Sequence, residues 1–178
     1  MSQSDPGWGT DFMKRVGLII AVQMLSLVFA ASVGAQSNTF SKVGGGNVDL
    51  AGEKGKVVVL AIGARWLPPT KSQASVLSRL ASQYPSDKVS MFLVLTDLET
   101  DSNDAQLDAF LKANKVSVPA LRDPRGSIVN KLFKPDQMPA FVVIGKTGEM
   151  SGGPMTGFDP KIDMFESVSR RIEAELRR

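Results

Sequence analysis

The chain has 178 residues, of which 43% are hydrophobic and 22% are charged, and its formal net charge is +3. These values are typical of one globular domain with its own core, and since the positive charge is spread along the chain, no nucleic-acid partner is expected. Cysteine and histidine are both absent, which excludes disulfides, thiolate or imidazole metal ligands, and catalysis by Cys–His or Ser–His pairs.

An uncharged apolar segment, residues 16–35, follows Lys14 and Arg15 near the N-terminus. A basic pair, an apolar stretch and small residues at its end form the pattern of an export signal, for which cleavage is expected after Ala35. The same segment is long enough to span a bilayer and remain as a membrane anchor with its basic end inside the cell. Residues 1–35 are therefore predicted to be a signal peptide or a membrane anchor. Both alternatives place the rest of the chain outside the cytoplasm, in the periplasm or anchored to the membrane.

The next segments predict a linker, a strand, a helix and a second strand. Residues 36–54 are rich in Gly, Ser and Asn, and we expect a linker with a short N-terminal hairpin there. Residues 57–63 are a continuous apolar run rich in β-branched residues, typical of a strand buried on both faces. A helix is expected from Thr70 to Tyr84, where apolar residues recur at three- and four-residue spacing, and residues 88–97 predict another buried strand.

In the C-terminal half, strands and helices continue to alternate. Residues 101–116 predict a helix, and residues 118–133 predict a short strand, a turn and one or two helical turns. Residues 139–150 predict a β-hairpin, and a final amphipathic helix is expected from Asp159 to the end. The apolar stripe of that helix comprises Ile162, Phe165, Val168, Ile172 and Leu176. This order predicts an α/β sandwich with a mixed central sheet.

The order and spacing of four segments carry a family resemblance. These segments are GKVVVLAIGARWLPPTKSQ, VLTD, RDPRGSIVNKLF and MPAFVVIGKTGEM. Together they resemble the thioredoxin-like fold and, within it, the TlpA-like group of exported, often membrane-anchored thiol–disulfide oxidoreductases. The resemblance runs from Gly55 to Met150. It implies a thioredoxin-like domain over residues 55–178, built as a three-layer α/β/α sandwich with a mixed central sheet.

The resemblance also assigns a degenerate active-site motif. This motif comprises Trp66, Leu67, Pro68, Pro69, Thr70 and Lys71. Leu67 stands where the group has its attacking cysteine, and Thr70 stands where it has the second cysteine. Met138 and Pro139 match the cis-proline groove, in which the group binds an extended substrate peptide. Because Leu67 cannot ionise or attack a disulfide, neither thiol–disulfide exchange nor cysteine-dependent peroxidase chemistry is available to this chain alone.

Several functions remain open for such a site. We expect a redox-inactive domain without cofactor or metal that binds protein segments in the cell envelope at the former active-site groove, as a chaperone, an adaptor or an assembly subunit. A second reading is a thiol- or glutathione-binding enzyme that uses Thr70 at a helix N-terminus. A third is a partner subunit of a redox system that supplies the cysteines. In a fourth, the groove is a relic and the function lies elsewhere.

Two side-chain roles complete the expectations. Thr70 is expected to cap the helix that it begins. An acidic stretch contains Asp97, Glu99, Asp101 and Asp104, but its spacing does not match an EF-hand, so we expect a solvated strand-to-helix loop instead of a calcium site.

Overall fold

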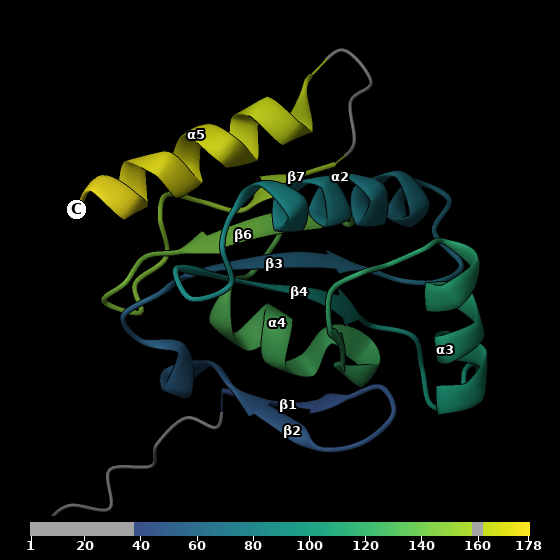
Figure 1. The fold of residues 1–178 in the computed structure, drawn as a ribbon. Helices are drawn as coiled ribbons and strands as arrows, with labels where there is room; N and C mark the ends of the chain where they lie inside the picture. The colour runs from purple at the N-terminus through teal and green to yellow at the C-terminus, as the bar shows by residue number, and fades with distance from the viewer. Residues whose placement is uncertain (1–37, 158–161) are drawn as a thin grey trace, which may run out of the picture. The chain divides into compact units, whose positions relative to one another are not determined.

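The structure is a computed structural model that describes residues 38–157 and 162–178. In this part of the chain, four α-helices cover a seven-stranded sheet of order β2-β1-β5-β4-β3-β6-β7 (Figure 1). The strands are β1 (Thr39–Lys42), β2 (Asn47–Asp49), β3 (Val57–Gly63), β4 (Val89–Leu95), β5 (Ala120–Arg122), β6 (Ala140–Ile144) and β7 (Met155–Thr156). The helices are α2 (Pro69–Gln83), α3 (Asp104–Ala113), α4 (Ser127–Leu132) and α5 (Met164–Arg177), with short 3-10 turns η1 (Leu50–Glu53) and η2 (Pro124–Gly126).

The sheet is mixed, as the order of elements predicts. β3 pairs in parallel with β4 and antiparallel with β6, and β4 pairs in parallel with β5. All seven residues of β3 are buried, which explains its unbroken β-branched sequence: a strand in the middle of a covered sheet has no solvent face. The expected α/β/α sandwich is therefore confirmed.

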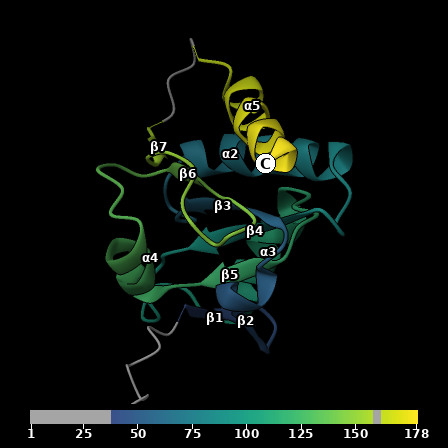
Figure 2. The same ribbon diagram turned by 90° about the vertical axis from the view of Figure 1, so that its left-hand side faces the viewer.

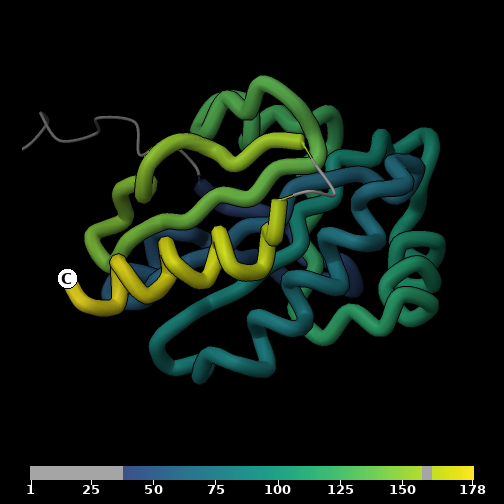
Figure 3. Tube along the Cα trace, turned by 90° about the horizontal axis from the view of Figure 1, so that it is seen from above, coloured from purple at the N-terminus to yellow at the C-terminus, as the bar shows by residue number. Residues whose placement is uncertain are grey.

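Two apolar cores lie on the two faces of the sheet. Alternate residues of β3 point to opposite faces, so that Val59 belongs to the core under α2, α3 and α5, whereas Leu60 belongs to the core under α4 and η1. Figure 2 shows α2 and α5 on one side of the sheet and α4 on the other. Seen from above, α5 runs alongside β6 (Figure 3).

The N-terminal hairpin forms as expected and joins the sheet. β1 pairs with β2, and its other edge pairs with β5. The turn between β1 and β2 contains three consecutive glycines with positive φ, Gly44, Gly45 and Gly46, a conformation that glycine adopts without the Cβ penalty. The compact unit accordingly starts at Asn38.

Two details of the C-terminal part differ from the expectations. The helix starts at Met164, after the cap Asp163, whose carboxylate accepts the Glu166 N–H at 3.1 Å. Ile162 therefore precedes the helix and is 52% exposed, so its place in the apolar stripe was wrong. The predicted second strand of the 139–150 hairpin is reduced to a single bridge between Ile144 and Met150, and β6 pairs with β7 instead.

The expected signal peptide or anchor over residues 1–35 lies outside the described residues. Among the helices of residues 38–157 and 162–178, none combines the length and the apolar character needed to cross a bilayer.

Candidate functional site

The former redox motif lies where the C-terminal ends of β3 and β4 meet the first turn of α2. Residues 64–68 form the loop between β3 and α2, and two tight turns shape it: the Leu67 N–H donates to the Ala64 carbonyl and the Thr70 N–H donates to the Leu67 carbonyl, each at 3.0 Å. Pro69 is the first residue of the helix, a position where proline is favourable because the first N–H groups of a helix lack partners inside the helix. The loop is therefore short and stiff.

Thr70 faces the protein interior. It is completely buried, and its Oγ1 accepts a hydrogen bond from the Ala64 N–H at 3.2 Å. The residue at the N-cap position of α2 is Pro68, which makes no side-chain cap hydrogen bond, so the expectation that Thr70 caps the helix was wrong. Because proline starts the helix one residue earlier, Thr70 lies inside the first turn and its hydroxyl bonds to the loop.

A tight contact fixes Thr70 against β3. A Cβ built on Gly63 would lie 2.6 Å from Thr70 Oγ1 and 2.8 Å from Thr70 Cγ2. Only a residue without a side chain fits at Gly63. One turn further along α2, the buried Gln73 donates from Nε2 to the Ala140 carbonyl at 2.7 Å, which ties α2 to the start of β6.

Met138 and Pro139 precede β6, and the peptide bond between them is cis. Pro139 is buried, and its carbonyl accepts the Gly157 N–H at 2.9 Å. Met138 is 39% exposed. The Thr96 hydroxyl lies 3.7 Å from Met138 Sδ and 3.1 Å from the Gly63 carbonyl oxygen, so the residue before the cis-proline lies beside the end of β3.

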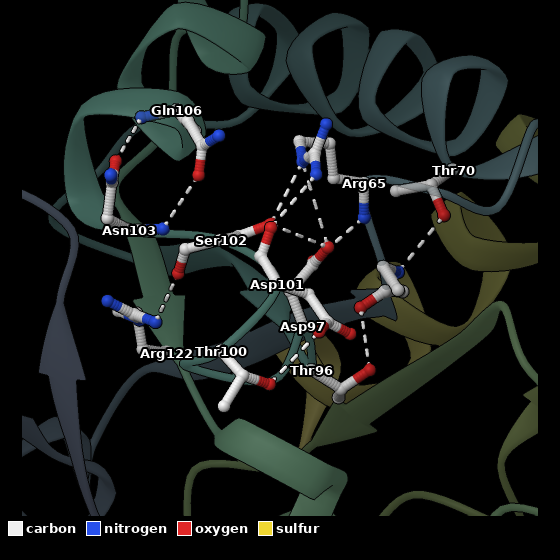
Figure 4. Close-up of polar contacts among 12 residues, drawn as sticks. Arg65, Thr70, Thr96, Asp97, Thr100, Asp101, Ser102, Asn103, Gln106 and Arg122 are labelled. Carbon is white, nitrogen blue, oxygen red and sulfur yellow. Dashed lines mark hydrogen bonds and ion pairs between the residues drawn. The ribbon is translucent and has the colours of Figure 1, made fainter.

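The sequence motifs did not identify the residue that holds the loop in place, which is Arg65. Its backbone N–H donates to Asp97 Oδ2 at 2.8 Å, and its Nε donates to Ser102 Oγ at 3.0 Å (Figure 4). Its Nη2 donates to the Asp101 carbonyl at 3.3 Å. The Asp97 side chain is only 1% exposed, and a buried carboxylate requires such partners. The loop after β3 is thus fixed to the loop after β4.

The acidic stretch is only partly the solvated loop that we expected. Asp97 is buried, and this part of the prediction was wrong. Asn103 caps α3 by accepting the Gln106 N–H at 3.0 Å, while the Gln106 side chain accepts the Asn103 N–H at 3.0 Å (Figure 4). Asp104 forms an ion pair with Arg122. These side chains serve helix capping and loop packing.

Apolar side chains contribute to the solvent-facing part of the site. Trp66 is 64% exposed and Leu98 is 36% exposed, and Leu67 is partly buried. We call Trp66, Leu67, Leu98 and Met138 the former active-site surface. Trp66 does not fill a gap between strand and helix, since most of its side chain contacts solvent.

Neither Leu67 nor Thr70 can carry out thiol chemistry. Leu67 and Thr70 occupy the positions of the two cysteines, the first with an inert side chain and the second with a buried hydroxyl. Lys71 is exposed at the first turn of α2. Within residues 38–157 and 162–178, no three His, Cys, Asp or Glu side chains are grouped to hold a metal ion. The surface therefore offers apolar contact area on a rigid backbone.

Comparison with known proteins places these features in a family. The profile of the AhpC/TSA family matches residues 33–151, more than half of the chain. Sporulation thiol-disulfide oxidoreductase A of Bacillus subtilis is 27% identical over 106 residues, which cover 58% of this chain and 63%, less than two thirds, of that protein.

Solved structures at lower identity share the fold. A secreted disulfide oxidoreductase of Mycobacterium tuberculosis has a TM-score of 0.62 at 23% identity, covering 78% of this chain and 96% of that one. A thioredoxin-like protein of Aeropyrum pernix has a TM-score of 0.62 at 17% identity, covering 90% of this chain and 98% of that one. These similarities confirm the thioredoxin-like fold.

Proposed function

The chain belongs to the AhpC/TSA family and is related to thiol–disulfide oxidoreductases, yet it contains no cysteine, and we propose that it is a redox-inactive domain that binds protein segments at the former active-site surface. Thiol–disulfide exchange requires a thiolate on the enzyme to attack the disulfide, and this chain has none to offer. Binding of a polypeptide requires only the surface that remains.

One observation carries the proposal: a largely exposed tryptophan stands on a loop that the rest of the molecule holds rigidly. Trp66 follows Arg65, whose backbone and side chain are both bonded to the loop after β4. Aromatic side chains on rigid supports contribute disproportionately to protein interfaces, because they bury a large area and lose little conformational entropy on binding. Leu67 extends this apolar area at the place where relatives of this kind carry out their chemistry.

The proposed partners lie in the cell envelope. The apolar segment at residues 16–35 has the pattern of an export signal or anchor, and the similar protein of Mycobacterium tuberculosis is described as secreted. We infer an extracytoplasmic location, with the domain exported or tethered to the membrane, and a role as chaperone, adaptor or assembly subunit.

The glutathione-binding alternative has little support from the geometry. It requires the Thr70 hydroxyl to reach a bound thiolate, but Thr70 has no exposed surface and its oxygen accepts the Ala64 N–H. The alternative of a partner subunit in a redox system uses the same surface as our proposal. It predicts that the bound protein carries the two thiols, which distinguishes it once a partner is known.

The experiment measures polypeptide binding by two variants, each with one methionine replaced by aspartate. The two methionines have almost the same exposure and lie at different ends of β6. Met138 is 39% exposed beside the cis-proline, and Met150 is 38% exposed beyond the other end of β6. The full chain in a nonionic detergent is titrated with a reduced, carboxymethylated polypeptide, a permanently unfolded probe, in a calorimeter. Met138→Asp is expected to weaken binding about fivefold to thirtyfold, since loss of a central apolar contact costs on the order of 1–2 kcal/mol.

Met150→Asp is the matched control and is expected to bind like the wild type. Circular dichroism verifies that both variants are folded. Equal affinity of the two variants, or an unfolded probe that does not bind the wild type at all, would contradict the proposed function.

A further inference from the structure

A hollow of about 710 Å³ lies between α5 and the segment 151–156 that leads into β7. The volume is in the range of sites that hold a drug-sized ligand or a few side chains. None of the four residues of the former active-site surface lines this hollow.

Among the described residues, three arginines line the hollow, Arg170 and Arg171 of α5 and Arg178 directly after it, together with one carboxylate, that of Glu175. The Arg170 side chain is 70% exposed, and its Nε lies 3.9 Å from Oε1 of Glu166. Arg171 donates to the carbonyl oxygens of Ser151, at 3.1 Å, and Gly153. Since carbonyl oxygens carry no net charge, these bonds orient the guanidinium without neutralising it. The lining is therefore positively charged.

A buried framework holds these arginines in position. Glu175 is only 5% exposed, and its Oε1 accepts hydrogen bonds from Ser151 Oγ at 2.7 Å and from Arg178 Nη1 at 2.8 Å. Its Oε2 lies so close to Gly145 that a Cβ there would collide with it. Gly152 has φ +69, and a Cβ on it would lie 3.5 Å from Arg171 Nη1. The absence of a side chain at Gly145 thus lets Glu175 approach closely, whereas Gly152 is favoured by its positive φ.

The lining also contains apolar side chains at the edge of the sheet, beside the polar Ser151, Thr156 and Ser167. Ile162 is 52% exposed there, and Met155 is partly buried. β7 is the last strand of the sheet. In an antiparallel pair, residues whose backbone groups bond to the partner strand alternate with residues whose backbone groups point away from it. The Gly157 N–H donates to the Pro139 carbonyl, so the N–H and C=O of the preceding Thr156 point away from β6.

We propose that this hollow binds an acidic, extended segment of a partner protein. Charge complementarity selects the occupant: carboxylates pair with Arg170 and Arg171, whose planar guanidinium groups suit bidentate contacts. An apolar side chain of the bound partner segment covers Ile162 and Met155. The backbone of that partner segment runs along the edge of β7. This site is separate from the one under "Proposed function" and does not depend on it.

The test uses two arginines that differ only in whether they line the hollow. Arg170 and Arg177 both lie on α5, are 70% and 72% exposed, and stand 3.9 Å and 3.8 Å from a glutamate four residues earlier. Arg177 is not part of the lining. The probes are a short fluorescent peptide of alternating glutamate and leucine, its lysine–leucine counterpart, and phosphatidylglycerol vesicles. Anisotropy measures peptide binding, and flotation measures vesicle binding, with the full chain in nonionic detergent or reconstituted.

The glutamate peptide is expected to bind, to dissociate more readily as salt concentration rises, and to bind about fivefold to tenfold more weakly to Arg170→Glu than to the wild type. Arg177→Glu is expected to change the affinity less than about twofold. The proposal is overturned if the glutamate peptide does not bind, if the lysine peptide binds equally well, or if both variants lose affinity equally. It is also overturned if Arg170→Glu abolishes vesicle binding while peptide binding is unchanged, since an anionic lipid would then be the occupant.

Discussion

Asp97→Ala removes the carboxylate that fixes the loop carrying Trp66. The main loss is the hydrogen bond from the Arg65 N–H to Asp97 Oδ2 at 2.8 Å, a bond to a charged acceptor worth about 1.5–3 kcal/mol. The contact with Ser102 Oγ is long at 3.4 Å. The ion pair with Arg65 Nε, at 3.9 Å, is discounted because the Arg65 side chain is 37% exposed. Together these terms predict a loss of about 2–3 kcal/mol in the free energy of unfolding.

Urea denaturation followed by circular dichroism measures this loss, and Asp101→Ala provides the control. The Asp101 carboxylate accepts only from the neighbouring Thr100 hydroxyl, among the described residues, while its backbone carbonyl holds Arg65. The control is therefore expected to change stability by no more than about 0.5 kcal/mol. If the two variants were equally stable, the loop would not depend on the Asp97 carboxylate.

Two further variants examine the former redox motif. Gly63→Ala places a Cβ within 2.8 Å of two Thr70 atoms and is expected to destabilise the domain by about 1–3 kcal/mol; a melting temperature equal to that of the wild type would show that α2 shifts freely. Leu67→Cys combined with Thr70→Cys places two thiols one helical turn apart, since the Thr70 N–H bonds to the Leu67 carbonyl at 3.0 Å. This double variant is expected to form an intramolecular disulfide under air and, when a thiol reductant keeps it reduced, to reduce the disulfides of insulin. The Leu67→Cys variant alone is expected to form mixed disulfides with insulin, which it cannot release because it lacks the second thiol. Two free thiols after oxidation would show that the loop has lost the geometry of a redox site.

The regular elements could be predicted because each has a local signal. β3 and β4 are unbroken apolar runs, and their burial on both faces accounts for that pattern. α3 carries an Asn103–Gln106 capping box at its start. For such elements, the residues that determine the structure are close neighbours in the chain.

The errors concern positions that depend on distant residues or on a helix start. The Arg65–Asp97 contact joins residues 32 positions apart, and nothing near either residue indicates its partner. Thr70 has the residue type of a cap, but Pro69 begins α2 and places it inside the first turn. Ile162 matches a helical period, yet the cap Asp163 follows it. Periodicity alone does not define where a helix begins.

The central claim, binding at the former active-site surface, is tested most directly by the fluorescence of Trp66. The chain has two tryptophans, so a Trp8→Phe variant leaves Trp66 as the sole source of this signal. At 64% exposure, Trp66 is expected to emit as a solvated indole and to shift to shorter wavelength, saturably, when the carboxymethylated polypeptide covers it. Binding of the polypeptide without any change in Trp66 emission would contradict the claim and place the function on another surface.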